Sequence, residues 1–209
     1  MTLEAKHLTF RYPRRGSPPV LEGVDLTLHT GERVGLSAPS GRGKTTLCKL
    51  LAGWETPSGG QVLLDGVPIA QYRGFCPVQL LWQHPEEGVD PLLRLRTTLY
   101  EAGPVDRAVL DGLGISDSWL ERRPPQLSGG ELQRICVARA MRPELRFLLC
   151  DEASAMLDLI TQARLWRFLL DQGQARELGF LVVSHDLRLL ERVCTRILSW
   201  EDLTGQSNE

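Results

Sequence analysis

The chain has 209 residues, of which 42% are hydrophobic and 24% are charged, and its formal net charge is −2. These values are ordinary for a soluble globular protein and exclude a disordered or fibrous chain. Because a protein that follows nucleic-acid phosphates usually carries a clear basic excess, nucleic acid is also excluded as an expected partner.

The cysteines are odd in number and include no CxxC pair, so we expect reduced thiols rather than a disulfide framework or a zinc site. They are Cys48, Cys76, Cys136, Cys150 and Cys194. The segment 1–15 lacks the apolar core of a signal peptide. The apolar stretch 178–183 is far shorter than the roughly 20 residues that span a bilayer. We therefore expect a cytosolic chain, whose membrane role would come through a partner subunit.

The amino-terminal part of the chain reads as strands around a glycine-rich loop. Residues 1–36 alternate apolar and polar positions, which predicts antiparallel strands around a turn at 14–19. A short buried strand at 34–36 leads into the loop, and leucines at helical spacing predict a helix at 45–54. A strand pair follows at 61–69.

The rest of the chain changes its pattern twice. Helical patterns dominate 84–141, which indicates a separate helical lobe. A strand, a helix and a strand then follow at 147–150, 161–172 and 180–183. This alternation of strands and helices predicts an α/β fold with a parallel sheet and crossover helices.

The run 38–45, Ala-Pro-Ser-Gly-Arg-Gly-Lys-Thr, matches a P-loop at every fixed position except the first, where Ala38 replaces glycine. In such a loop the backbone N–H groups of 40–45 can wrap a triphosphate at a helix N-terminus. Lys44 can then reach the β and γ phosphates, and the Thr45 hydroxyl can ligate Mg²⁺. The alternative is a glycine-rich turn that binds nothing. If position 38 needs a positive φ, Ala38 would be strained by about 1 kcal/mol or more.

The strand at 147–150 delivers Asp151 and Glu152 to its carboxyl end, where ligands bind in open α/β sheets. In a P-loop enzyme the first carboxylate holds Mg²⁺, and the second orients and polarises the attacking water. Taken alone, an Asp-Glu pair after a strand is more often the start of a solvated loop. Its position after a P-loop and a helical lobe favours the catalytic interpretation.

The run 127–133, Leu-Ser-Gly-Gly-Glu-Leu-Gln, is the most specific string in the chain. Ser128 and Glu131 have the spacing of a capping box, which predicts that a helix begins here. A capping box does not account for Gly129 and Gly130, which lower helix propensity but leave N–H groups open to an anion. The run resembles the signature of the ATP-binding cassette family.

The resemblance covers nearly the whole chain and implies its fold. That fold is an α/β P-loop NTPase core with a parallel sheet, an antiparallel β subdomain and an inserted α-helical lobe. The resemblance implies one nucleotide-binding domain over 1–209. The ATP-binding core with its β subdomain would occupy 1–83 and 142–209, and the helical signature lobe 84–141.

The resemblance also implies a role for each site residue. Glu152 and His185 would be catalytic, and Asp158 would lie at a dimer interface. Mg²⁺ would contact Thr45, Gln83 and Asp151. The implied contacts with ATP are Tyr12, Ala38, Pro39, Ser40, Gly41, Arg42, Gly43, Lys44, Thr45 and Thr46, although a lone strand tyrosine such as Tyr12 is more often sheet packing. The residues implied to bind ATP of an opposite subunit are Ser128, Gly129, Gly130 and Gln133.

Two stretches, 83–101 and 157–163, resemble the peptide and nickel importers more than other branches of the family. Asp90 and Leu92 depart from the Asn and Arg usual in that branch. The chain stops soon after Trp200, which favours a nickel or metallophore importer over an oligopeptide importer.

This branch implies ATP and Mg²⁺ as cofactors and several protein partners. The partners would be a second ABC ATPase subunit in a homo- or heterodimer, transmembrane permease subunits and, indirectly, an extracytoplasmic substrate-binding protein. The chain would lie peripherally on the cytoplasmic face of the inner membrane. We expect the permease contact at 83–101, with Trp82, Leu92, Leu93 and Leu95 as apolar surface, unless these side chains pack the lobe's own core.

Two other functions stay open. A soluble cassette ATPase of DNA maintenance or translation would typically carry a long coiled coil or a second cassette, and the sequence contains neither. A hydrolysis-deficient nucleotide-binding partner subunit is indicated by Ala38 and by Ala155, which stands where the family often has serine. Glu152 and His185 argue against it. The transported substrate stays open between nickel or a metal chelate and an oligopeptide.

Overall fold

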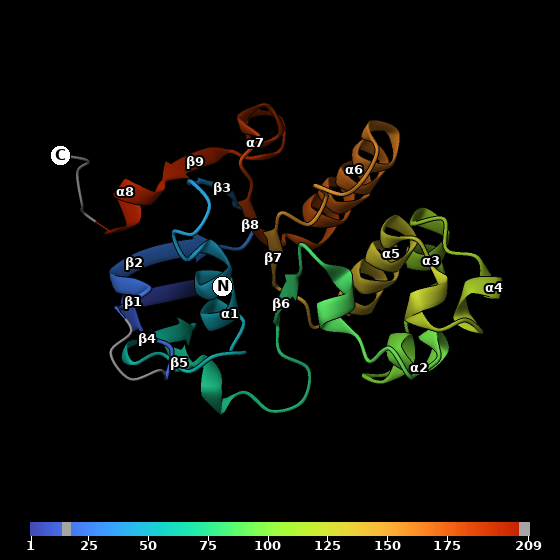
Figure 1. The fold of residues 1–209 in the computed structure, drawn as a ribbon, viewed down its shortest axis with the longest axis horizontal. Helices are drawn as coiled ribbons and strands as arrows, with labels where there is room; N and C mark the ends of the chain where they lie inside the picture. The colour runs from blue at the N-terminus through green and yellow to red at the C-terminus, as the bar shows by residue number, and fades with distance from the viewer. Residues whose placement is uncertain (14–17, 205–209) are drawn as a thin grey trace.

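Two sheets and the helices around them make up the computed structural model, which describes residues 1–13 and 18–204 (Figure 1). The first sheet is antiparallel, with the strand order β2-β1-β4-β5. Its strands are β1 (Thr2–Phe10), β2 (Leu21–His29), β4 (Gly59–Leu64) and β5 (Val67–Pro68). The predicted antiparallel strands are confirmed, while the turn predicted at 14–19 lies mostly outside the described residues.

The second sheet is parallel, with the strand order β6-β7-β8-β3-β9. Its strands are β3 (Arg33–Ser37), β6 (Val78–Leu81), β7 (Phe147–Asp151), β8 (Gly179–Val183) and β9 (Arg196–Ser199). Because these strands are parallel, their carboxyl ends share one edge of the sheet. That edge collects the P-loop after β3, Gln83 after β6, the acidic pair at the end of β7 and His185 after β8.

The helices pack on both faces of the parallel sheet and extend away from it at one end (Figure 1). They are α1 (Lys44–Leu51), α2 (Leu95–Tyr100), α3 (Arg107–Gly112), α4 (Asp117–Leu120), α5 (Gly129–Ala140), α6 (Leu159–Arg176), α7 (Leu187–Val193) and α8 (Trp200–Thr204). The helical pattern predicted for 84–141 is confirmed by α2 to α5, which lie together on the right of Figure 1.

The side chains of β7 show how the layers are joined. Alternate side chains of a strand point to opposite faces of its sheet. Phe147 and Leu149 belong to a hydrophobic cluster with α1 and the antiparallel sheet. Leu148 and Cys150 belong to a second cluster with α5, α6 and α7. Every residue of β7 is buried, so its carboxyl end is held firmly between two layers.

Some boundaries differ from the prediction. The helix predicted at 45–54 ends at Leu51, because Gly53 adopts the left-handed conformation that stops a helix. The helix predicted at 161–172 is longer and is capped by Asp158. Strands β6 and β9 and helices α7 and α8 were not predicted. The five cysteines are free, as expected. Nowhere in 1–13 or 18–204 does a helix combine the length and the apolar character needed to cross a bilayer.

Candidate active site

The P-loop joins β3 to α1 and depends on its last glycine. Gly43 has a φ of 94° and forms the N-cap of α1. A Cβ at this position would lie 2.9 Å from a side-chain atom of Val20, so glycine is required both for conformation and for space. Ala38 is not among the described non-glycine residues with positive φ. The strain considered for Ala38 therefore does not arise, and alanine fits at the first position.

Lys44 is buried inside the P-loop. Its Nζ donates hydrogen bonds to the carbonyl oxygens of Ala38 at 2.7 Å and Pro39 at 2.9 Å. A buried cation requires such partners, because an unpaired ammonium group in the interior is very costly. The two carbonyls provide the partners that the buried ammonium group needs.

A cavity of about 420 Å³ opens beside Lys44 and gathers residues from distant parts of the chain. Its lining comprises Tyr12, Val20, Ser40, Gly41, Gly43, Lys44, Thr45, Thr46, Gln83, Asp151 and Glu152. Tyr12 packs edge-on against Phe10 and hydrogen-bonds Thr46 through its hydroxyl at 3.2 Å, so it both packs on the sheet and borders the cavity. A volume in this range suits a small-molecule ligand.

Asp151 ends β7 at the floor of this cavity and is almost fully buried. Burial raises the pKa of Asp151, and the neighbouring charge of Glu152 raises it further. A hydrogen bond with the Thr45 side chain and the positive charge of Lys44 act in the opposite direction. The ionised form of Asp151 is therefore less favourable at this position than in water.

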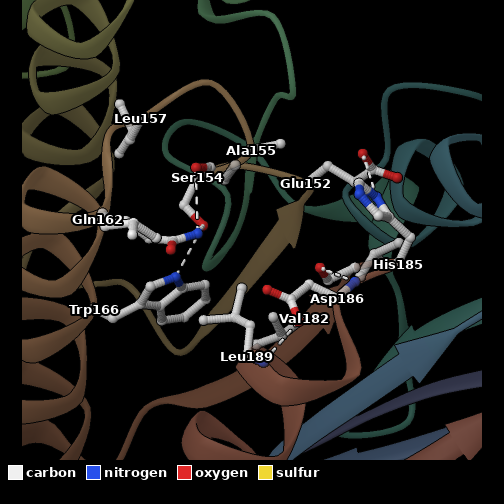
Figure 2. Close-up of a pocket in the computed structure, with 14 residues that line it drawn as sticks. Glu152, Ser154, Ala155, Leu157, Gln162, Trp166, Val182, His185, Asp186 and Leu189 are labelled. Atoms are coloured by element: carbon white, nitrogen blue, oxygen red, sulfur yellow. Dashed lines mark hydrogen bonds and ion pairs between the residues drawn. The ribbon is translucent and has the colours of Figure 1, made fainter.

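Glu152 lies beside Asp151 but points elsewhere. Its φ is 48°, in the left-handed region, and its N–H donates to the carbonyl of Val183 at 3.0 Å. Figure 2 shows its carboxylate facing the ring of His185, whose Nδ1 lies 3.3 Å from the Glu152 Oε2. The Glu152 side chain is 13% exposed and that of His185 is 71% exposed. A carboxylate held this way at a cavity rim has the geometry of a general base with an orienting partner.

The capping box predicted at the start of α5 is confirmed. Glu131 Oε2 accepts from the backbone N–H of Ser128 at 2.8 Å, and Ser128 Oγ accepts from the N–H of Glu131 at 3.3 Å. The hydrogen bond from the Ser128 backbone lowers the pKa of Glu131. Gly129 has open space where a Cβ would be, whereas a Cβ at Gly130 would lie 3.0 Å from the Leu157 side chain. These residues do not line the cavity beside Lys44, so in one chain they lie apart from it.

Gln133 does not lie with the other signature residues. It is 2% exposed, and neither atom of its side-chain amide has a hydrogen-bond partner among the described residues. The contact expected between Gln133 and the ATP of an opposite subunit is not available from this buried position. The helical period explains the difference, because Gln133 falls on the inner face of α5 with Leu132 and Cys136.

Asp158 forms the N-cap of α6 and is exposed. Its Oδ1 accepts from the N–H groups of Ile160 and Thr161, each at 3.0 Å. The adjacent Met156, Leu159 and Ile160 are exposed apolar side chains. The sequence analysis did not single out these side chains, although two apolar residues at the first turn of a helix are a visible signal of a contact surface.

Only two of the four side chains expected to form an apolar surface for the permease are exposed. Leu92 and Leu93 are exposed, as expected. Trp82 and Leu95 are buried. Trp82 packs edge-on against Trp54. Leu95 is the first residue of α2 and belongs to the second hydrophobic cluster, with α5, α6 and α7. Their side chains therefore pack the protein's own interior.

Comparison with known proteins identifies the family of the chain. The family model described as ABC transporter matches residues 21–155. The nickel import ATP-binding protein NikE of Shigella dysenteriae serotype 1 (strain Sd197) is 40% identical over 197 residues, which cover 86% of this chain and 74% of the relative. NikE of Escherichia coli (strain K12) gives the same identity and coverage.

Solved structures resemble the fold. The dimeric structure of a bacterial ABC transporter cassette covers 94% of this chain and 93% of its own, with a TM-score of 0.81 and 22% identity. The structure of an ATP-binding subunit of an ABC transporter covers 95% of this chain and 85% of its own, with a TM-score of 0.79 and 23% identity. These matches confirm the predicted fold class. The chain belongs to the ABC transporter family and is an ATPase of that family.

Proposed function

We propose that the chain binds ATP in the cavity beside Lys44 and hydrolyses it to drive a bacterial importer. The observation that carries the proposal is the position of Glu152, which lines the same cavity while its carboxylate lies 3.3 Å from the ring of His185. Glu152 would accept a proton from the attacking water, and His185 would hold its carboxylate and contact the γ-phosphate. Tyr12 would stack on adenine, and the P-loop from Ala38 to Thr46 would hold the phosphates.

Mg²⁺ is proposed as the metal at this site. The Thr45 hydroxyl and the Asp151 carboxylate interact with one another, and Gln83 borders the same cavity. These are oxygen donors of the kind that Mg²⁺ prefers, and the ion normally needs only one or two protein ligands beside phosphates and water. When bound, it would neutralise charge on the β and γ phosphates.

A second ATPase chain is proposed to complete the site. Ser128, Gly129 and Gly130 at the N-terminus of α5 would bind the γ-phosphate of ATP held by that chain, and Asp158 would lie at the contact. The exposed Met156, Leu159 and Ile160 beside Asp158 support an interface there. The partner chain is proposed to be a second copy or a paralogue.

The importer is proposed to carry nickel or a metal chelate. The support is the 40% identity to nickel import ATP-binding proteins over most of the chain. Permease subunits would contact the segment 83–101, and an extracytoplasmic binding protein would act through them. In this proposal 84–141 is a helical lobe that moves against the core formed by 1–83 and 142–209, on the cytoplasmic face of the membrane. An oligopeptide is the second candidate cargo, because 157–163 also resembles the peptide importers.

Uptake in the native host distinguishes these cargoes. Disruption of the gene is expected to abolish uptake of radiolabelled Ni²⁺, and a plasmid copy of the parent chain, but not of Lys44→Ala, is expected to restore it. Loss of labelled oligopeptide uptake with normal Ni²⁺ uptake would move the proposal to the second cargo. Normal uptake of both by the disrupted strain would contradict a transport role for this chain in either pathway.

A further inference from the structure

The loop between β7 and α6 is fastened at its centre by one serine hydroxyl. Ser154 Oγ accepts a hydrogen bond from Trp166 Nε1 at 3.0 Å and a second from Gln162 Nε2 at 3.1 Å. Ser154 and Trp166 are both buried. Figure 2 shows the two side chains of α6 converging on Ser154, on the opposite side of the pocket from His185.

Helical geometry explains why these groups meet. Gln162 and Trp166 are four residues apart on α6 and therefore lie on one face of the helix. The start of that helix is fixed in turn by Asp158, which caps it. A serine hydroxyl has two acceptor lone pairs, and both are used here. Because Trp166 is buried, loss of the hydroxyl would leave its N–H without a partner.

The fastened loop carries residues of the proposed site at its two ends. Glu152 lies two residues before Ser154, and Asp158 lies four residues after it. Two backbone hydrogen bonds make the connection short and stiff: Ala155 donates to the Glu152 carbonyl at 3.0 Å, and Leu157 donates to the Ser154 carbonyl at 3.2 Å. A shift of Ser154 would therefore move the peptide group of Glu152 with it.

We infer that Ser154, Gln162 and Trp166 are positioning residues for ATP hydrolysis. They fix the loop so that Glu152, in its left-handed conformation, directs its carboxylate to the rim of the nucleotide cavity. None of the three lines the cavity beside Lys44, so they act through Glu152 and leave ATP binding alone. The inference rests on the proposed role of Glu152 as the base.

The test separates turnover from binding. Ser154→Ala and Trp166→Phe are each expected to lower kcat about 10- to 100-fold, because a displacement of about 1 Å at a reacting group costs about 10²-fold in rate. The Kd for ATP is expected to stay at the parent value in both variants. Ser154→Thr keeps the hydroxyl and is expected to recover most of the lost kcat. Trp119→Phe, a matched change in the helical lobe, is expected to retain the parent rate.

A double-mutant cycle identifies the contact itself. If the Ser154–Trp166 hydrogen bond is responsible, the double variant is no slower than the slower single variant. Parental kcat in Ser154→Ala would overturn the inference, and so would a loss of ATP affinity or of folded protein as large as the loss of kcat. Glu152→Gln is measured alongside. If Glu152→Gln hydrolyses ATP at the parent rate, the proposed role of Glu152 as the base is wrong. If Glu152→Gln is inactive while Ser154→Ala has the parent kcat, only the positioning role is contradicted.

Discussion

At the scale of single residues, Asp151 and Glu152 are adjacent in the chain but lie in different environments. Asp151 is buried at the end of β7, and burial raises its pKa. Glu152 turns away from it toward His185. A folded-state pKa above the unfolded value means that ionised Asp151 opposes folding at neutral pH, and that this cost disappears as the pH falls through the folded pKa. Such a loss of stability is typical of sites where a charged side chain is needed for function.

Asp151→Asn is therefore expected to stabilise the protein without nucleotide while removing hydrolysis. Asparagine keeps an oxygen for the Thr45 hydroxyl and removes the buried charge. The free energy of unfolding at pH 7 is expected to exceed that of the parent, and the difference is expected to shrink at lower pH. Denaturant titrations at several pH values, without Mg²⁺ or ATP, check this. A less stable variant at pH 7 would contradict the conclusion that the ionised form of Asp151 opposes folding.

Glu152→Gln is expected to retain ATP affinity and to slow hydrolysis by about 10²- to 10⁴-fold, the usual contribution of a positioned base. Calorimetric titration with ATP and a phosphate-release assay measure the two quantities. Glu191→Gln changes an exposed glutamate on α7 and serves as the control, with the parent rate expected. Parental turnover by Glu152→Gln would show that the base lies elsewhere.

Residues fixed by a motif were predictable, and residues fixed by packing were not. Lys44 and Glu152 lie in one cavity because the P-loop and the strand end specify their backbone. Gln133 belongs to the same string as Ser128 but is buried, because its position in the helical repeat places it on the inner face of α5. Trp166 gave no signal at all, since a tryptophan in an amphipathic helix reads as ordinary core.

At the scale of elements, the segment from β6 to α2 presents similar side chains with opposite exposures. Leu92 is 75% exposed, while Leu95 is fully buried in α2. The 3-10 turn Pro85–Gly88 before them carries the exposed Glu86 and Glu87. The exposed leucines and acidic side chains of this segment therefore lie in this turn and in the stretch before α2, whereas the leucines of α2 itself are buried.

Charge reversal in the turn, Glu86→Lys with Glu87→Lys, is expected to uncouple transport while basal ATPase activity stays intact. Reversed charges disturb the electrostatic match at a docked interface, whereas the cavity beside Lys44 contains neither residue. Leu92→Ser is expected to do the same. ATPase assays with and without the permease, together with uptake, measure both effects.

Leu95→Ala provides the contrast, because it opens a cavity in the core. It is expected to cost about 2 to 5 kcal/mol of stability, which thermal unfolding would detect. Normal permease stimulation in the charge-reversal variant and in Leu92→Ser would move the docking surface away from this segment.

The elements that sequence analysis missed share a physical cause. Strands β6 and β9 have four residues each, too few for alternation to be informative, and they are strands because partners from far along the chain pair with them. The P-loop helix α1 was predicted because its leucines repeat at helical spacing after a glycine-rich loop. The predicted end of α1 was wrong because the left-handed conformation of Gly53 depends on the surrounding fold as well as on the local sequence.

At the scale of the whole molecule, one chain provides half of each proposed site. The signature residues at the start of α5 lie outside the cavity that holds Lys44 and Glu152. Glu152→Gln with Mg²⁺ and ATP is therefore expected to form a stable dimer, alone or with a paralogue, because the nucleotide stays sandwiched. Sedimentation or light scattering gives the mass.

Ser128→Arg places a bulky side chain at the exposed start of α5 and is expected to keep Glu152→Gln monomeric. Lys6→Ala, an exposed change in β1, is expected to leave the dimer intact. A mass of one chain for Glu152→Gln in saturating ATP, with and without the paralogue, would rule out the sandwich.

The strand order also governs when the site can form during synthesis. Val34 of β3 pairs with Leu181 of β8 on one side and with Arg196 of β9 on the other. A ribosome releases β3 well before either of its neighbours. The strand that leads into the P-loop thus has no parallel neighbour to pair with until β8 has been synthesised, since pairing between such distant segments has to wait for the later one. Products truncated before β8 are therefore expected to bind no ATP and to be degraded readily by proteases, because β3 then lacks both of its partner strands.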